Sequence, residues 1–260
     1  MDYEFIKVEA KAGVTTIALN RPEVMNAINS TMHHELQAAF DAFAADPAQL
    51  ICVVTGIGQK AFCAGSDLKA AVAGDIPTYP KNGYAGFIER FDLFKPVIAA
   101  VNGVCLGGGF EFALACDIII ASDNASFGLP EPRVGVIALA GGIHRIVRQI
   151  GMKRAMGLLL TSERVTAQQG FDLGFVNEVV AQSELQAAVD RYCRRILINS
   201  PVAIRTTKEV AMRGLDEPDL ATAIRNQADY PGFRTMLASE DIKEGPKAFA
   251  EKRTPVWRGR

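Results

Sequence analysis

The chain has 260 residues, of which 49% are hydrophobic and 22% are charged, and its net charge at pH 7 is −1. This length and apolar content predict one large folded domain, or one domain with a small appendage, and exclude a disordered polyelectrolyte. The balanced charge argues against a surface that recruits nucleic acid or an anionic membrane, so we expect small molecules or further copies of the chain as partners.

The five cysteines occur without a CxxC pair and without a cysteine–histidine cluster. They predict buried thiols in a reducing cytosol and no metal site. The acidic start, residues 1–4, does not resemble a signal peptide, and the longest uncharged stretch, residues 96–110, is too short to span a membrane. We therefore expect a cytoplasmic protein without a membrane segment.

In chain order, the first predicted elements are two short strands within residues 5–19. A helix follows that Ser30 or Thr31 caps and that ends at Asp46. Its apolar side chains recur at helical spacing at Met32, Leu36, Ala39, Phe40 and Phe43.

Two histidines, His33 and His34, are neighbours on this helix. Adjacent helix positions point about 100° apart, so the pair cannot converge on a metal ion without other ligands. We expect both side chains on a solvated helix surface.

Continuous apolar runs predict buried strands at residues 50–55 and 96–101. Further strands are predicted at residues 61–64, 117–121 and 175–180. Ser66 or Asp67 caps a predicted helix over residues 68–72, and residues 87–94 also have a helical pattern. The irregular stretch at residues 73–86 is long for a loop, and we expect it to line a ligand cleft.

Helices dominate the second half of the predicted elements. Two are predicted within residues 142–160, with Arg145 and Arg148 facing outward, and another begins near Thr166. From Ser183 onward every periodic segment is helical. Repeated strand–helix units with a helical C-terminal third predict an α/β core, with a doubly wound sheet as an alternative architecture.

Two carboxylates stand at unusual backbone positions. Glu111 follows three glycines at residues 107–109, where an apolar strand passes into a helix. The first amides of a helix have no intrahelical acceptor, so such a helix start suits a developing negative charge, although a tight turn alone also explains the glycines. Glu131 stands between two prolines, where the stiff backbone fixes the direction of its side chain.

Three segments occur in collinear order: FCAGSDLK at residues 62–69, GGGFE at 107–111 and FGLPE at 127–131. Together they resemble the crotonase (enoyl-CoA hydratase/isomerase) superfamily. Residues 239–253 also resemble the C-terminus of that family, and residues 255–260 are most similar to its carnitinyl-CoA dehydratase branch.

This resemblance implies an α/β fold in which repeated ββα units form a right-handed spiral, in place of the doubly wound sheet. The crotonase-like spiral core would occupy residues 1–200. A C-terminal helical region at residues 201–260 would mediate homo-oligomers, either trimers or dimers of trimers.

The resemblance also implies roles for four residues. The backbone amides of Ser66 and Gly108 would form an oxyanion hole for a thioester. Glu111 would act as the base that activates water, and Glu131 would deliver a proton to the alpha carbon in the hydration direction. Without the family, Glu111 is explained as a partner of the helix dipole and Glu131 as a surface turn residue.

Contacts with coenzyme A are implied along two segments, at Val24, Met25, Ala64, Asp67, Leu68 and Lys69. Lys69 would meet a phosphate, although a solvated helix lysine explains it equally well. Where many hydratases have proline and glycine before paired glycines, this chain has Leu139, which adds bulk beside the expected reaction centre. We therefore expect a reshaped acyl pocket at Leu139.

The expected activity is that of an enoyl-CoA hydratase or dehydratase, which adds water reversibly across the double bond of a 2-enoyl-CoA thioester. Coenzyme A is part of the substrate, so we expect no separate cofactor. One alternative is an enoyl-CoA isomerase, which by the family pattern needs only Glu131. The other is a non-catalytic acyl-CoA or RNA-binding relative, and the near-neutral charge argues against RNA.

Overall fold

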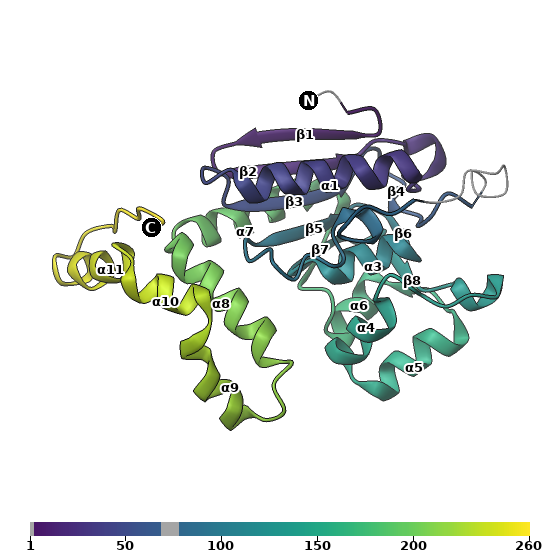
Figure 1. Ribbon diagram of the computed structural model, residues 1–260. Helices are drawn as coiled ribbons and strands as arrows, with labels where there is room; N and C mark the ends of the chain where they lie inside the picture. The colour runs from purple at the N-terminus through teal and green to yellow at the C-terminus, as the bar shows by residue number, and fades with distance from the viewer. Residues whose placement is uncertain (1–2, 69–77) are drawn as a thin grey trace. The chain divides into compact units, whose positions relative to one another are not determined.

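The computed structural model describes residues 3–68 and 78–260, and the chain forms two compact units. The first unit comprises Met1–Arg90 and Val97–Asp190, and the second comprises Phe91–Pro96 and Arg191–Arg260. The described strands lie in the first unit, and helices make up most of the second (Figure 1). The boundary between core and C-terminal region near residue 200 stays a prediction.

The larger sheet of the first unit has six strands in the order β1-β2-β3-β5-β7-β10. Its strands are β1 (Ile6–Lys11), β2 (Val14–Leu19), β3 (Ile51–Gly56), β5 (Val97–Val101), β7 (Ile118–Ser122) and β10 (Glu178–Val180). β1 and β2 pair antiparallel, and the other pairs are parallel. Every residue of β5 is buried, which is typical of a parallel strand covered on both faces and confirms the prediction from its apolar run.

The smaller sheet has four short strands in the order β4-β6-β8-β9. They are β4 (Ala61–Cys63), β6 (Val104–Leu106), β8 (Ser126–Gly128) and β9 (Val165–Thr166). Between β5 and β6 the chain crosses from one sheet to the other at Asn102. The side-chain amide of Asn102 donates hydrogen bonds to the backbone oxygens of Gly56 and Gly58, at 2.9 and 2.7 Å. The successive pairs β3/β4, β5/β6 and β7/β8 thus each contribute one strand to each sheet, as expected for ββα units, whereas β1 and β2 both lie in the larger sheet.

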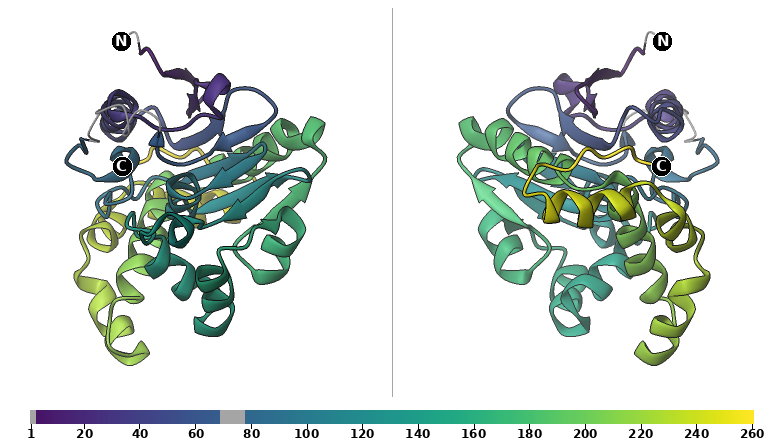
Figure 2. Two further views of the ribbon diagram at one scale, coloured as in Figure 1. Left: turned by 90° about the vertical axis from the view of Figure 1, so that its right-hand side faces the viewer. Right: turned by 90° about the vertical axis from the view of Figure 1, so that its left-hand side faces the viewer.

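Helices cover this framework. They are α1 (Ser30–Ala45), α3 (Gly108–Ala115), α4 (Gly142–Ile150), α5 (Met152–Thr161), α6 (Ala167–Leu173) and α7 (Leu185–Leu197). α1 packs beside β1 and β2 (Figures 1 and 2). Asn29 rather than Ser30 or Thr31 caps it, because the Asn29 side chain accepts from the Met32 amide at 2.9 Å. The helix predicted over residues 68–72 lies outside the described residues apart from Leu68.

The helix predicted over residues 87–94 is wrong. The chain forms a short 3-10 helix at Tyr84–Gly86 and continues in turns. Gly83 and Gly86 have φ angles of 71° and 57°, and Ala85 has a φ angle of 54°. Phe87 has a φ angle of −137°, and the Glu89 amide donates to the Asn82 oxygen at 3.1 Å instead of to the oxygen four residues before it. The backbone hydrogen bonds therefore do not follow the helical pattern that the apolar spacing suggests.

Two surface predictions are also wrong. His33 is only 1% exposed, because the segment around Tyr84 covers this face of α1, and its Nδ1 accepts a hydrogen bond from the Ala85 amide at 2.9 Å. Arg145 does not point outward. It is partly buried, and its guanidinium donates to the backbone oxygen of Ile88.

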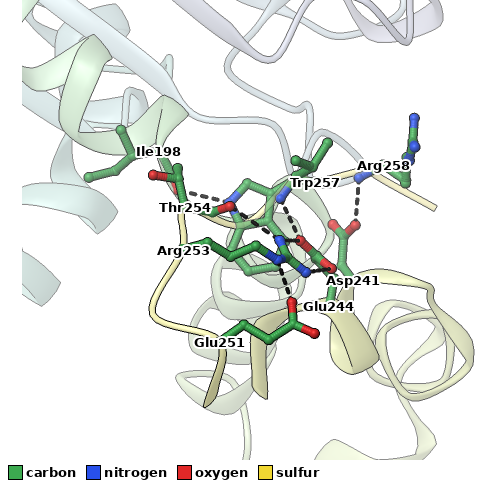
Figure 3. A network of polar contacts seen from close by, with 9 residues as sticks. Ile198, Asp241, Glu244, Glu251, Arg253, Thr254, Trp257 and Arg258 are labelled. Atoms are coloured by element: carbon green, nitrogen blue, oxygen red, sulfur yellow. Dashed lines mark hydrogen bonds and ion pairs between the residues drawn. The ribbon is translucent and has the colours of Figure 1, made fainter. Parts of the chain in front are cut away.

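The helices of the second unit are α8 (Pro201–Gly214), α9 (Leu220–Asn226), α10 (Pro231–Ala238) and α11 (Asp241–Ala250). They confirm the predicted helical C-terminal third. Figure 3 shows how the tail after α11 is held. Asp241 accepts from the Arg258 amide at 2.7 Å, Arg253 forms an ion pair with Glu244 at 2.6 Å, and the Trp257 indole donates to the Ile198 oxygen at 2.8 Å.

Candidate active site

A cavity of about 550 Å³ lies in the first unit, at residues that directly follow β4, β6 and β8. Because these three strands are parallel, the segments that follow them meet at one edge of the smaller sheet, where ligands of α/β proteins commonly bind. The lining includes Ser66, Gly108, Glu111 and Glu131. The structure therefore brings together all four residues for which the family resemblance implies catalytic roles.

Two backbone amides at the cavity wall, those of Ser66 and Gly108, make no hydrogen bond to any of the described residues. The turn at Gly65 packs directly on the start of α3. A Cβ atom on Gly65, whose φ is +97°, would lie 3.2 Å from the Gly108 nitrogen. Helix α3 adds the positive end of its dipole, so the two amides are suited to bind an anionic oxygen.

Glu111 lies in the first turn of α3 and is only 3% exposed. Its Oε1 accepts a hydrogen bond from the Gly142 amide at 2.8 Å. Burial raises the pKa of this carboxyl from 4.5 to about 7, the Gly142 amide opposes the shift, and the charge of Glu131 adds to it. The carboxyl group of Glu111 therefore exchanges its proton near neutral pH.

Glu131 begins the short 3-10 helix at Glu131–Val134 that follows β8. Its Oε1 would lie 3.0 Å from a Cβ atom at Gly107, so this approach depends on a glycine. Its Oε2 is buried, and no described residue donates a hydrogen bond to it. Burial also raises the pKa of Glu131. A buried acceptor without a partner costs about 1–3 kcal/mol of folding free energy, and a bound group can satisfy it.

The cavity lining also includes Ala64, Asp67, Leu68 and Leu139. Val24 and Met25 do not line it, but the Met25 carbonyl oxygen accepts from the Ala64 amide at 3.0 Å, so their segment lies directly behind the cavity wall. Lys69 lies outside the described residues.

Leu139 is 78% exposed and belongs to an apolar rim that also includes Val134, Val136 and Ile137. Of the stretch at residues 73–86 that we expect to line a ligand cleft, Tyr79, Gly83 and Tyr84 line the cavity, and residues 73–77 lie outside the described part of the chain. Its binding of a ligand stays a prediction. Leu139 was predicted individually, but the other rim residues and Tyr84 were not. No motif or spacing marks them, because they reach the cavity only through the course of their loops.

Among residues 3–68 and 78–260, no group of three or more histidine, cysteine or acidic side chains could hold a metal ion. No helix in this described part is long and apolar enough to cross a membrane. All five cysteines are buried and none forms a disulfide, as predicted. The cavity itself offers two amide donors and two carboxyl groups with raised pKa values, which are suited to stabilise an oxyanion and to move protons.

Comparison with known proteins places the chain in a family. The Enoyl-CoA hydratase/isomerase family model matches residues 9–260. A carnitinyl-CoA dehydratase of Proteus mirabilis is 40% identical over 259 residues, which cover 98% of each chain. The crystal structure of carnitinyl-CoA hydratase from Mycobacterium avium is 42% identical, with a TM-score of 0.79 and full coverage of both chains.

The crystal structure of enoyl-CoA hydratase from Mycobacterium tuberculosis H37Rv is 34% identical, with a TM-score of 0.92, and covers 98% of this chain and 99% of its own. These matches confirm the predicted crotonase-like α/β spiral over the doubly wound sheet. They also confirm the family indicated by the three collinear motifs. The chain belongs to the enoyl-CoA hydratase/isomerase family.

Proposed function

We propose that this protein is a hydratase or dehydratase of 2-enoyl-CoA thioesters, and thus a carbon–oxygen lyase. Its family membership and its hydratase and dehydratase relatives support an acyl-CoA substrate. The observation that carries the proposal is the pair of buried carboxyl groups, Glu111 and Glu131, at one cavity beside two free amides. An isomerase shuttles one proton and has no need of the second carboxyl, so the pair favours hydration.

In the proposed hydration, the thioester oxygen accepts hydrogen bonds from the amides of Ser66 and Gly108. Glu111, as a carboxylate, takes a proton from a water molecule, and the water oxygen bonds to the β-carbon. The electrons of the double bond move toward the thioester oxygen, where the two amides stabilise the enolate. Glu131 then gives its proton to the α-carbon, which yields a 3-hydroxyacyl-CoA. Dehydration follows the same steps in reverse.

Within this class of thioesters, the more specific candidate substrate is carnitinyl-CoA or crotonobetainyl-CoA, each of which carries a trimethylammonium group. This substrate is supported by the similarity to a carnitinyl-CoA dehydratase and a carnitinyl-CoA hydratase, and by the chemistry of the cavity. Tyr79, Tyr84 and Glu89 line it together with the two catalytic candidates, and aromatic rings and carboxylates both attract a quaternary ammonium. Leu139 at the rim would limit which acyl groups enter.

Further parts of the proposal concern binding and assembly. Coenzyme A would lie along Ala64, Asp67 and Leu68, with Val24, Met25 and Lys69 near it, and no separate cofactor would be required. The C-terminal helical region would form trimers or dimers of trimers, and the protein would act in the cytoplasm without a nucleic-acid or membrane partner.

The test is to mix purified protein with crotonyl-CoA or crotonobetainyl-CoA and to follow the loss of conjugated-thioester absorbance. Glu111→Gln and Glu131→Gln should each lower kcat by about 10²–10⁴-fold, because each removes a proton-transfer group. If the protein were an isomerase, Glu111→Gln would convert a 3-enoyl-CoA to the conjugated isomer at nearly the wild-type rate. Absence of turnover with both 2-enoyl substrates would contradict hydration.

A further inference from the structure

The phenol hydroxyl of Tyr84 lies between the two turns that supply the free amides. Ser66 Oγ donates a hydrogen bond to Tyr84 Oη at 3.3 Å. On the other side, a Cβ atom on Gly108 would collide with both Cζ and Oη of Tyr84. The hydroxyl therefore contacts the first residue of α3 as well as the turn after β4, and Tyr84 also lines the cavity.

The ring of Tyr84 is held in this place by its surroundings. It is 6% exposed and packs edge-on against His33, with ring centroids 4.5 Å apart and an interplanar angle of 74°. His33 accepts from the Ala85 amide at 2.9 Å, which fixes the backbone next to Tyr84. A phenol held on two sides is prearranged, so it needs no reorganisation when a ligand binds.

The hydroxyl proton of Tyr84 is available to a ligand. Tyr84 Oη accepts from Ser66, and none of the described residues accepts a hydrogen bond from it. Burial raises the pKa of Tyr84 well above its ordinary value, so the phenol keeps its proton at neutral pH. A neutral phenol in this position can donate, as the two backbone amides can.

We infer that Tyr84 donates a third hydrogen bond to the thioester oxygen, and that the Ser66 hydroxyl is a positioning group that orients the phenol. This inference rests on the proposed function, because it assigns the thioester oxygen to the amides of Ser66 and Gly108. Hydrogen bonds to a charged oxygen are stronger than those to a neutral one. The donor therefore stabilises the enolate more than the bound thioester, and its removal should lower kcat more than it raises KM.

The kinetic test compares Tyr84→Phe, Ser66→Ala and the double variant with wild type. Tyr84→Phe keeps the ring packing and should lower kcat about 10–100-fold, the range of a hydrogen bond to a charged group, with KM changed by less than about threefold. Ser66→Ala keeps the backbone amide and should cause a smaller loss. The double variant should match Tyr84→Phe, because Ser66 acts through the phenol. Tyr192→Phe, which does not line the cavity, is the matched control.

A second readout does not depend on turnover. Acetoacetyl-CoA forms an enolate that absorbs in the near ultraviolet, so a pH titration of the complex gives the pKa of the bound ligand. We expect Tyr84→Phe to raise that pKa by about 1–2 units, equivalent to about 10–100-fold in enolate stabilisation. Tyr192→Phe should leave it at the wild-type value.

The outcomes separate this inference from the proposed function. A wild-type protein that does not hydrate enoyl-CoA but shows the Tyr84-dependent enolate shift would contradict the function and support the third donor. A wild-type hydratase whose Tyr84→Phe variant has unchanged kcat and an unchanged enolate titration would overturn the third donor alone. A change in KM without a change in kcat would also overturn the third donor, because the hydroxyl would then stabilise the bound thioester as much as the enolate.

Discussion

Glu111→Gln removes a carboxyl group that burial holds at a pKa of about 7 instead of 4.5. The pKa of Glu111 is higher in the folded chain than in the unfolded chain, so the group contributes its full stabilisation of the fold at pH values below the unfolded pKa. This contribution is lost as the pH rises through about 7. The difference of about 2.5 pKa units corresponds to about 3 kcal/mol that the wild type loses between about pH 4.5 and about pH 8. Glutamine carries no charge at either pH and can still accept from the Gly142 amide.

The assay is urea unfolding of both proteins at about pH 5 and about pH 8, at one protein concentration so that any association contributes equally. Relative to wild type, the free energy of unfolding of Glu111→Gln should rise by about 2–3 kcal/mol between the two pH values. Glu184→Gln, a change at an exposed glutamate, should show no such rise. A difference between Glu111→Gln and wild type that stays constant with pH would refute the buried, protonated state of Glu111.

Three other predictions concern the site and its support. The kcat/KM for hydration should rise with pH through about 7, as Glu111 loses its proton; a profile that is flat across this range in the thioester absorbance assay would contradict the role of Glu111 as the base. Gly108→Ala should lower activity more than about tenfold and stability by about 1–3 kcal/mol, measured by kinetics and thermal unfolding, because the new methyl group collides with a fixed ring. His33→Leu should lower the free energy of unfolding at pH 7 by about 1–3 kcal/mol, because the Ala85 amide loses its acceptor. Since the pKa of His33 is lowered to about 4, the wild type should also lose stability as the pH falls from 6.5 toward 4, and urea unfolding should show that His33→Leu lacks this loss.

The framework of the fold could be predicted because its signals are local. The fully buried strand β5 appears as a continuous apolar run, and α1 appears as apolar residues at helical spacing. The burial of His33 could not be predicted, because it depends on a segment some 50 residues later that packs over α1. The apolar spacing of residues 87–94 was misleading, because the backbone there makes non-helical hydrogen bonds such as that from the Glu89 amide to the Asn82 oxygen.

The candidate site also combines features with a local sequence signal and features that depend on contacts between distant segments. Ser66, Gly108, Glu111 and Glu131 stand in short motifs, so their common location at one cavity followed from the family resemblance. The raised pKa of Glu111 could not be predicted, because it results from burial and from the charge of Glu131, against the opposing effect of an amide 31 residues away. Tyr84 lies in a loop without a motif, and only the three-dimensional structure shows its contact with Gly108.

The central claim is that this cavity adds water across the double bond of an enoyl-CoA. The most direct measurement is mass spectrometry of the product formed from crotonyl-CoA or crotonobetainyl-CoA in deuterated water labelled with heavy oxygen. We expect a 3-hydroxyacyl-CoA with one heavy oxygen on the β-carbon and one deuterium on the α-carbon, formed about 10²–10⁴-fold more slowly by Glu111→Gln and by Glu131→Gln. A product that gains deuterium without heavy oxygen, or a Glu111→Gln variant that still incorporates the oxygen at the wild-type rate, would contradict it.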